Sequence, residues 1–410
     1  PADTTALFRY ERAYDEMAAM LDSSDSVCLK RAVFLPEWAY VGDELNYNIY
    51  CARLDTMAAA LRAFIAANRL DDAPIGAHIA LFEFFVRPYA MNGYKPFDYE
   101  FEDCDGEVDF TNTFVTKLMR THSGQCRSLP LLYKLLANEI GAEAYIAYAP
   151  CHTFVRHRDE TGEGWINVEL TSRNLPRDEF IIETMGITQE AIDKGTYMKP
   201  CGDREILLSL LVEMASGYLK KIGYIDPPVW RCIETVLTRD STHLTALMVK
   251  SNCLNAIAQQ QLRRLVERGL PVEPFVEQLR AIFSELNGRI DRTGYVEMPE
   301  HLREASRRAI DAEMMPLPSE EATPPVTKMY FGFLSFISSF ERIWSEKFFV
   351  NTPSAAAPSQ ARSVPPAATA AYASRSSDSR AASRSMSFTF SIVSAISRLA
   401  RSIFSRTSAI

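Results

Sequence analysis

The residues best suited to chemistry are a cysteine, a histidine and a glutamate that follow one another within residues 124–170. Gly124-Gln125-Cys126 forms a turn that runs into a predicted helix, and His152 begins a predicted strand. A thiolate at a helix N-terminus is stabilised by aligned peptide dipoles and free N–H groups, which lower a cysteine pKa from about 8.5. A histidine within hydrogen-bond reach takes the thiol proton, and a third polar group orients the imidazole. This order of residues predicts nucleophilic cysteine catalysis.

The third polar group is expected on the strand predicted at Trp165–Leu170. Side chains alternate along a strand, so Trp165, Asn167 and Glu169 share one face. With His152 on the neighbouring strand, either Glu169 or Asn167 would reach the second ring nitrogen, but only the carboxylate would also stabilise the imidazolium charge. Taken alone, Cys126 fits a buried core cysteine and His152 a structural histidine. Their joint order favours a triad of Cys126, His152 and Glu169.

The elements that must position these residues form an α+β unit. A helix is predicted at Ser128–Ile140, with Pro130 in its first turn and Gly141 as its C-cap. Antiparallel strands are predicted at Tyr145–Ala149, His152–Arg158 and Trp165–Leu170, with a hairpin loop at 159–164. A helix packed on this antiparallel sheet would bring the cysteine and the histidine together.

At these residues the chain resembles the transglutaminase-like superfamily, the cysteine branch that shares a papain-like core. The resemblance rests on Gly124-Gln125-Cys126, on His152, and on the strand that ends in Glu169-Leu170-Thr171, and it covers roughly residues 110–175. It implies that Cys126 is the nucleophile, His152 the general base and acid, and Glu169 the orienting acid. Family members usually carry Asp where Glu169 stands, and often an aromatic residue where Arg127 stands.

The resemblance implies acyl transfer through a thioester, most simply by a peptidase or amidase acting on a protein or peptide, with no cofactor. The Cys126 backbone N–H would supply one oxyanion donor, and the Gln125 side chain is a weak candidate for the second. Trp165 and Asn167 are candidates for substrate binding or orientation. The alternative is a non-catalytic interaction scaffold, in which a helical region at 203–315 binds a protein partner.

Composition and charge exclude several other classes of function. The formal net charge is −8, and residues from Met329 onward carry nine Lys+Arg against three Asp+Glu, so the first 328 residues carry −14. A body this acidic argues against a nucleic-acid binder, since phosphate binding needs a positive surface. The eight cysteines include no CxxC pair, so no metal site is expected. No apolar run reaches about 18 residues, which argues against a membrane-spanning helix.

Five regions are predicted along the chain: an N-terminal helical region (1–109), the transglutaminase-like core (110–202), a helical region (203–315), a proline-rich linker with an aromatic helix (316–350) and a disordered Ala/Ser/Pro/Arg-rich tail (351–410). The third region has a faint likeness to tetratricopeptide repeats, but no clean 34-residue period, so a simple helical layer is the other interpretation. Besides the helix at Ser128–Ile140, a helix inside the core is predicted at 110–120, and helices outside the core are predicted at 4–22, 52–69, 74–88, 204–222, 227–237, 242–268, 272–286 and 299–313.

The end of the tail, at 388–404, carries apolar residues on one stripe with two arginines beside it. Such a helix could lie on an anionic membrane surface or pack on a partner, while the plainer interpretation is a frayed serine-rich end. The chain begins at Pro1, so either an initiator methionine or a leader was removed. A removed leader would imply an exported or periplasmic protein, and its absence a cytoplasmic one.

Overall fold

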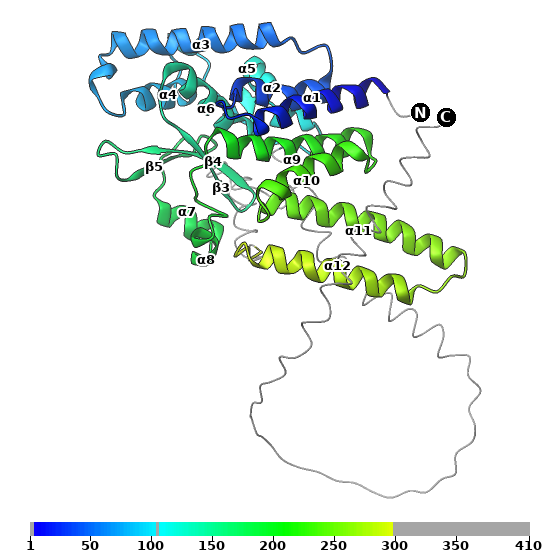
Figure 1. The fold of residues 1–410 in the computed structure, drawn as a ribbon. Coiled ribbons are helices and arrows are strands. Elements are labelled where there is room, and N and C mark those ends of the chain that lie inside the picture. Colours follow the sequence, from blue (N-terminus) through cyan, green and yellow to red (C-terminus); the bar gives the residue numbers. More distant parts are fainter. Residues whose placement is uncertain (1–3, 104–105, 298–410) are drawn as a thin grey trace, which may run out of the picture. The chain divides into compact units, whose positions relative to one another are not determined.

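The computed structural model describes residues 4–103 and 106–297, which form a mixed α and β structure (Figure 1). The predictions for 299–313, for 316–350 and for the tail at 351–410 lie outside the described residues. In the described part of the chain, no helix is long and apolar enough to cross a membrane. The α+β class predicted from the sequence is confirmed at this level.

Twelve α-helices and three short 3-10 helices make up most of the described chain. The α-helices are α1 (Thr4–Asp22), α2 (Leu29–Val41), α3 (Tyr47–Ala67), α4 (Gly76–Val86), α5 (Val115–Thr121), α6 (Ser128–Ile140), α7 (Asp178–Met185), α8 (Gln189–Asp193), α9 (Asp203–Ile222), α10 (Pro227–Arg239), α11 (Leu244–Glu267) and α12 (Glu273–Asp291). The 3-10 helices are η1 (Leu70–Asp72), η2 (Ala90–Asn92) and η3 (Phe110–Thr113).

Two small sheets accompany these helices. The first pairs β1 (Asp98–Tyr99) with β2 (Ser123–Gly124) in parallel. The second is antiparallel and contains β3 (Tyr145–Ala149), β4 (His152–Arg158) and β5 (Trp165–Val168) in that order. The ladders place Ala149 opposite His152, and Arg158 opposite Trp165. The predicted three-stranded hairpin arrangement is therefore confirmed, with its last strand ending two residues early.

Local chemistry explains where several elements begin and end. The helix predicted at 128–140 is confirmed, and Gly141 ends it with a left-handed φ of +77° that a side chain would oppose. The single helix predicted at 110–120 is wrong, because Phe114 adopts an extended conformation and separates η3 from α5. Helix α2 was not expected from the sequence, because its apolar residues are spread around the helix rather than along one stripe.

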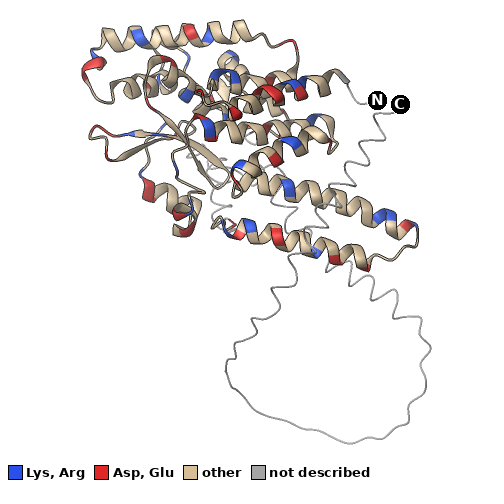
Figure 2. Cartoon of the chain, in the orientation of Figure 1, with Lys and Arg blue, Asp and Glu red and all other residues tan. Residues whose placement is uncertain are grey.

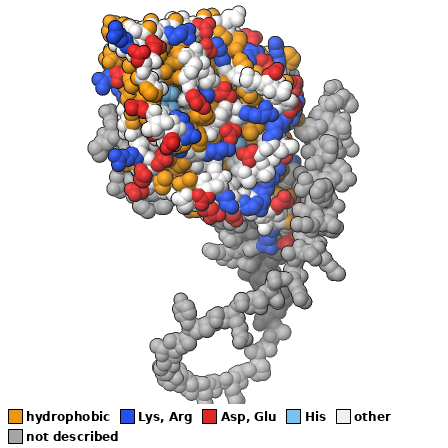
Figure 3. Space-filling model, turned by 60° about the vertical axis from the view of Figure 1, so that its left-hand side comes forward, with side chains coloured by type: hydrophobic (Ala, Val, Ile, Leu, Met, Phe, Trp, Pro, Cys, Tyr) orange, Lys and Arg blue, Asp and Glu red, His pale blue; other side chains and the backbone are white. Residues whose placement is uncertain are grey.

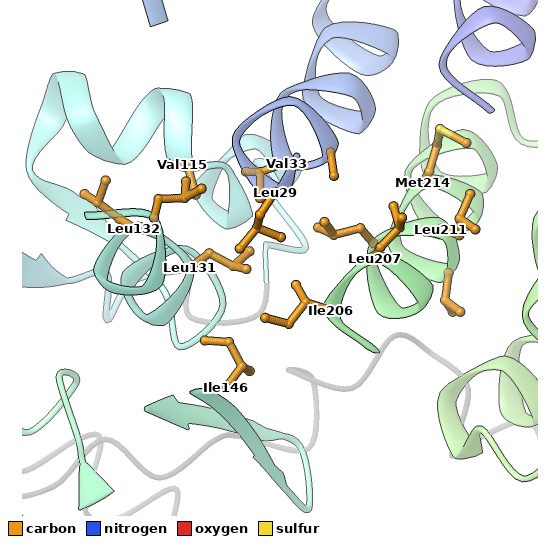
Figure 4. Packing of buried hydrophobic residues seen from close by; sticks show 14 of the residues in the cluster. Leu29, Val33, Val115, Leu131, Leu132, Ile146, Ile206, Leu207, Leu211 and Met214 are labelled. Atoms are coloured by element: carbon orange, nitrogen blue, oxygen red, sulfur yellow. The ribbon is translucent and has the colours of Figure 1, made fainter. Parts of the chain in front are cut away.

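A shared hydrophobic core explains why α2 lacks one apolar stripe. Buried residues from α2, α5, α6, β3 and α9 converge in one cluster (Figure 4). The labelled members are Leu29, Val33, Val115, Leu131, Leu132, Ile146, Ile206, Leu207, Leu211 and Met214. Because α2 packs on both α1 and α9, more than one of its faces is buried. Residues from the predicted regions 1–109, 110–202 and 203–315 thus share one core.

The helices that follow the core pack in chain order. Helix α10 lies against α9, α11 against α10, and α12 against α11. The outer part of α11 and α12 has a small hydrophobic cluster of its own, made of Ala258, Leu262, Val272, Leu279 and Phe283. Successive antiparallel pairing of this kind is compatible with either a helical layer or repeats.

Charged side chains of both signs alternate over the described structure. Figure 2 shows acidic and basic residues interspersed along the helices, and the face in Figure 3 carries both signs among hydrophobic side chains. Ion pairs join distant segments, as between Arg31 and Glu16 and between Lys134 and Asp203. Each of these ion pairs neutralises one acidic side chain of the described residues.

Candidate active site

The turn before Cys126 is fixed by close packing around Gly124. A side-chain carbon at Gly124 would lie 2.5 Å from Ser128 Oγ and 2.8 Å from Leu118 Cδ1, so only glycine fits. Ser128 Oγ accepts a hydrogen bond from the Gln125 backbone N–H at 2.9 Å. It also donates to the Asn112 carbonyl at 3.2 Å. These contacts hold the turn that precedes α6 in a single conformation.

Cys126 lies in this turn, directly before α6. The Leu129 N–H donates to the Gln125 carbonyl at 3.0 Å, so the helical hydrogen bonding already begins around the cysteine. Its side chain is 6% exposed. The sequence therefore places the thiol where the unpaired N–H groups of a helix start stabilise negative charge.

His152 reaches the site from the tight turn between β3 and β4. Pro150 and Cys151 form that turn, with Cys151 in the left-handed region at a φ of +57°. Proline followed by a residue of positive φ is typical of a type II turn, in which glycine normally takes the second position. The His152 side chain is buried.

Glu169 binds the Nε2 atom of His152 through its Oε2 atom, in a short buried ion pair. Burial by itself would lower the pKa of His152, but the charge and hydrogen bond of Glu169, with a contribution from the Cys126 thiol, raise it to about 10. Burial would likewise raise the pKa of Glu169, yet the charge and hydrogen bond of His152 and the donors of Thr171 hold it below its usual value. The geometry thus favours an imidazolium paired with a carboxylate.

Because Nε2 of His152 is bound to Glu169, Nδ1 is the ring nitrogen available to the Cys126 sulfur. It is buried and makes no conventional hydrogen bond to any described residue. The Cys126 thiol is nonetheless close enough to act on the pKa of the imidazole, both as a hydrogen-bond partner and as a charge. Hydrogen bonds between catalytic groups are often long in unliganded enzymes and tighten when substrate binds.

Glu169 is itself fixed by the residues that follow it. Its Oε1 atom accepts hydrogen bonds from Thr171, at 3.0 Å from the backbone N–H and 2.6 Å from Oγ1. Its backbone N–H and carbonyl pair with Asn174, both at 3.0 Å. Both carboxylate oxygens of Glu169 therefore accept hydrogen bonds, which hold its side chain in one orientation.

Two predicted site residues on β5 lie away from this cluster. Asn167 donates to the Pro176 carbonyl at 3.0 Å and to Asp178 Oδ1 at 2.7 Å, and so links β5 to α7. The ring of Trp165 lies 3.9 Å from the Arg158 guanidinium carbon. Arg158 is six residues beyond His152 on β4, about 20 Å along an extended strand. Neither Asn167 nor Trp165 makes a hydrogen bond or ring contact with the His152 imidazole.

The neighbours of Cys126 in the sequence point away from it. The Gln125 side-chain amide donates to the Asp103 carbonyl at 2.6 Å, which ties the acidic segment around Asp103 to the turn. Arg127 lies 3.5 Å from Glu213 of α9. At the position where the transglutaminase-like pattern often has an aromatic residue, this chain therefore has an ion pair between α6 and α9.

Glu37, on α2, is a buried carboxylate that was not expected from the sequence. Both oxygens of Glu37, on α2, accept backbone N–H groups at the start of α5, from Val115 at 2.8 Å and from Thr116 at 2.9 Å. Burial raises the pKa of Glu37 to about 7, against the lowering effect of those hydrogen bonds. The only signal in the sequence was an acidic residue inside an otherwise apolar run.

Glu37 lines a small hollow that is also lined by Glu213 and by aromatic residues of α1, α2 and η3. None of Cys126, His152 and Glu169 lines this hollow. The hollow and the three candidate catalytic residues are thus separate features.

Within residues 4–103 and 106–297, no group of three or more His, Cys, Asp or Glu side chains is arranged to hold a metal ion. The site holds a buried cysteine, a buried imidazole and a buried carboxylate that Thr171 anchors. Comparisons of the chain with family models, with curated proteins and with solved structures find no match.

Proposed function

We propose that this chain is a transglutaminase-like cysteine acyl-transfer enzyme, most simply a peptidase or amidase acting on a protein or peptide. The observation that supports it is the line of interactions from Cys126 through His152 and Glu169 to Thr171. Nε2 of His152 is held by the carboxylate, which leaves the buried Nδ1 as the ring nitrogen available to the thiol.

In the proposed reaction, the Cys126 thiolate attacks the carbonyl carbon of an amide. The developing oxyanion accepts the Cys126 backbone N–H, and the His152 imidazolium gives its proton to the leaving amine as the C–N bond breaks. This leaves a thioester and a neutral imidazole. His152 then removes a proton from water, which attacks the thioester, releases the carboxylic acid and restores the Cys126 thiolate beside the imidazolium.

Glu169 stabilises the imidazolium throughout and does not exchange a proton with substrate. Its lowered pKa keeps it ionised at neutral pH. Gln125 is a poor second oxyanion donor because its amide is bound to the Asp103 carbonyl. The acceptor of the acyl group in the second step is water in this proposal, and a primary amine would give transamidation by the same chemistry.

The experiment is labelling with an electrophilic peptide amide probe, followed by mass-spectrometric mapping of the modified cysteine. We expect Cys126 to react far faster than the other cysteines, and Cys126→Ala to abolish both labelling at that site and amide hydrolysis. Cys151→Ala is the matched control, because Cys151 lies beside His152 in the sequence and is half-buried. Equal labelling at all accessible cysteines would overturn the proposal.

A second candidate is a non-catalytic interaction scaffold. The observation that favours it is the burial of all three residues, with Cys126 and Glu169 6% exposed and His152 5%. In a scaffold the same interactions would serve to stabilise the hairpin against α6. Cys126→Ala with unchanged partner binding and no detectable hydrolysis by the unaltered chain would favour this function.

A further inference from the structure

A second pair of cysteines lies away from the candidate active site, where α2 meets α3. The Arg31 guanidinium carbon is 4.6 Å from the centre of the Tyr47 ring, and Lys30 Nζ is 3.6 Å from Asp55 Oδ1. Cys51 lies one helical turn after Tyr47 and one turn before Asp55. The face of α3 that carries Cys51 is therefore the face turned toward the start of α2.

Cys28 occupies the matching place on the other side. It is the residue before α2, and its carbonyl accepts the N–H groups of Arg31 at 3.0 Å and Ala32 at 2.9 Å. It precedes Arg31 by three residues and so shares its face. Further along α2, Phe34 packs against Tyr47 with ring centres 5.0 Å apart, whereas Lys30 pairs with Asp55. The contacts therefore follow opposite orders along the two helices, from which we infer that Cys28 lies near the turn of α3 that holds Cys51.

The Tyr47 hydroxyl lies close enough to both Cys51 and Cys28 for their charges to raise its pKa. Burial raises the pKa of Tyr47, and so do its hydrogen bond with Cys51 and the charges of Cys51 and Cys28. One phenol hydroxyl therefore feels both sulfurs. This agrees with the register deduced from the contacts of Arg31, Lys30 and Phe34.

Cys28 and Cys51 are more exposed to solvent than most of the other described cysteines. Cys28 is exposed and Cys51 half-buried. Burial raises the pKa of Cys201, Cys232 and Cys253 to about 12, which keeps those thiols protonated and unreactive. A dissolved oxidant would therefore reach Cys28 before it reached the core.

We propose that Cys28 and Cys51 form a reversible disulfide that fastens the start of α2 to α3, and that this pair is a redox-responsive site distinct from Cys126. Cys28 makes no side-chain capping hydrogen bond, so its sulfur can turn toward Cys51 without loss of a helix cap. The bridge would close the chain through residues 29–50 and restrain the unfolded state.

The oxidant is a peroxide. The Cys28 thiolate attacks one peroxide oxygen, the O–O bond breaks, and the products are a sulfenic acid and water once the second oxygen is protonated. The Cys51 thiolate then attacks the sulfenic sulfur, forming the S–S bond and releasing the second water. The two sulfurs lose two electrons in total, the peroxide gains them, and both thiol protons end in water.

The test uses the full chain carrying Cys126→Ala, so that the proposed nucleophile does not consume oxidant. After treatment with hydrogen peroxide we expect the intact mass to fall by about 2 Da, because two hydrogens leave on disulfide formation. Non-reducing peptide mapping should join the peptides that hold Cys28 and Cys51. The thermal midpoint should rise, and dithiothreitol should reverse both changes.

Cys28→Ser and Cys51→Ser should each abolish the mass loss and the thermal shift, whereas the matched control Cys151→Ser should retain them. A sulfenic or sulfinic acid at Cys28 with Cys51 still open to alkylation would overturn the proposal. So would a bridge to any other cysteine. Because Cys126 is absent from these variants, either result leaves the acyl-transfer proposal untouched.

Discussion

Glu169 favours the charged form of His152, and Thr171 fixes the orientation of Glu169. Thr171 donates twice to one carboxylate oxygen while His152 takes the other, so the carboxylate cannot rotate without breaking a buried hydrogen bond. The extra methylene of Glu relative to Asp is accommodated by this anchoring. Two predictions belong at this scale, and both rest on the proposed acyl-transfer activity.

Thr171→Val removes the Oγ1 donor and keeps the backbone N–H. A hydrogen bond to a charged group contributes about 1.5–3 kcal/mol, so we expect kcat/KM to fall by roughly ten- to a hundredfold. Thr171→Ser keeps the hydroxyl and should retain most of the activity. Steady-state hydrolysis of the probe amide measures both variants, and equal activity in all three chains would contradict the positioning role.

Glu169→Gln should move the pH dependence of the reaction. The pKa of His152 is raised to about 10, so the imidazolium needed to protonate the leaving amine is lost only as the pH rises through that value. The substitution removes the main favourable charge and should shift the alkaline limb of kcat/KM to lower pH. Histidine titration by NMR provides an independent reading, and an unmoved limb would show that Glu169 does not set this pKa.

At the scale of the elements, two buried titratable sites join parts that are distant in sequence. Glu37 links α2 to the start of α5, and the stacked rings of His78 and His157 link α4 to β4 with centres 3.8 Å apart. The burial of Glu37 favours its protonated form, while the burial of the two histidines favours their neutral forms. Glu37 therefore stabilises the fold more at low pH, whereas His78 and His157 stabilise it more at high pH.

Glu37 should make the chain less stable as the pH rises. Its folded pKa of about 7 lies above the value of 4.5 in the unfolded chain, so its favourable contribution is complete below pH 4.5 and is lost as the pH rises through 7. Glu37→Gln should flatten this part of the stability profile. Glu37→Leu leaves two buried N–H groups without acceptors and should cost about 2–5 kcal/mol in the free energy of unfolding. Denaturant titrations across this pH range measure both effects.

The histidine pair should make the chain less stable in acid. Burial and the charge of His157 lower the pKa of His78 to about 3, and burial lowers the pKa of His157. Their contribution is present above pH 6.5 and is lost as the pH falls, by up to about 3 kcal/mol near pH 4 for His78. Replacing both rings with phenylalanine should reduce this loss relative to the unaltered chain. Parallel acid profiles for the two proteins would contradict it.

At the scale of the molecule, the shared hydrophobic cluster makes the site depend on distant segments. Residues of α2 and α9 pack against α6 and β3, the elements that carry or adjoin Cys126 and His152 (Figure 4). Arg127 and Glu213 add an ion pair across the same boundary. The region at 110–202 therefore lacks a complete core of its own.

This predicts the behaviour of two fragments. A chain of residues 110–202 should fail to unfold cooperatively, because it exposes the apolar surfaces that α2 and α9 cover. A chain of residues 1–297 should keep a cooperative transition. Circular dichroism during thermal unfolding distinguishes the two, and a cooperative transition in the shorter fragment would show that the region folds independently.

Much of the site's immediate framework was readable from the sequence. Period-two alternation and turn residues predicted the three strands, and the leucine stripe with Gly141 predicted α6 with its bounds. These are local properties, fixed by backbone sterics and by which face of an element is apolar. The order of Cys126, His152 and Glu169 followed from the same local pattern.

The sequence by itself determined which elements form around the cysteine and the histidine, because propensity, capping and alternation act over a few residues. The sequence favoured Glu169 over Asn167 as the partner of His152 on charge alone. Only the tertiary structure shows why Asn167 does not compete, since its amide binds Asp178 while Thr171 holds Glu169. It also decided that Trp165 lies by Arg158 and that Glu37 caps α5. Such contacts join residues far apart in the chain, and the energy that selects them exists only once the core has packed.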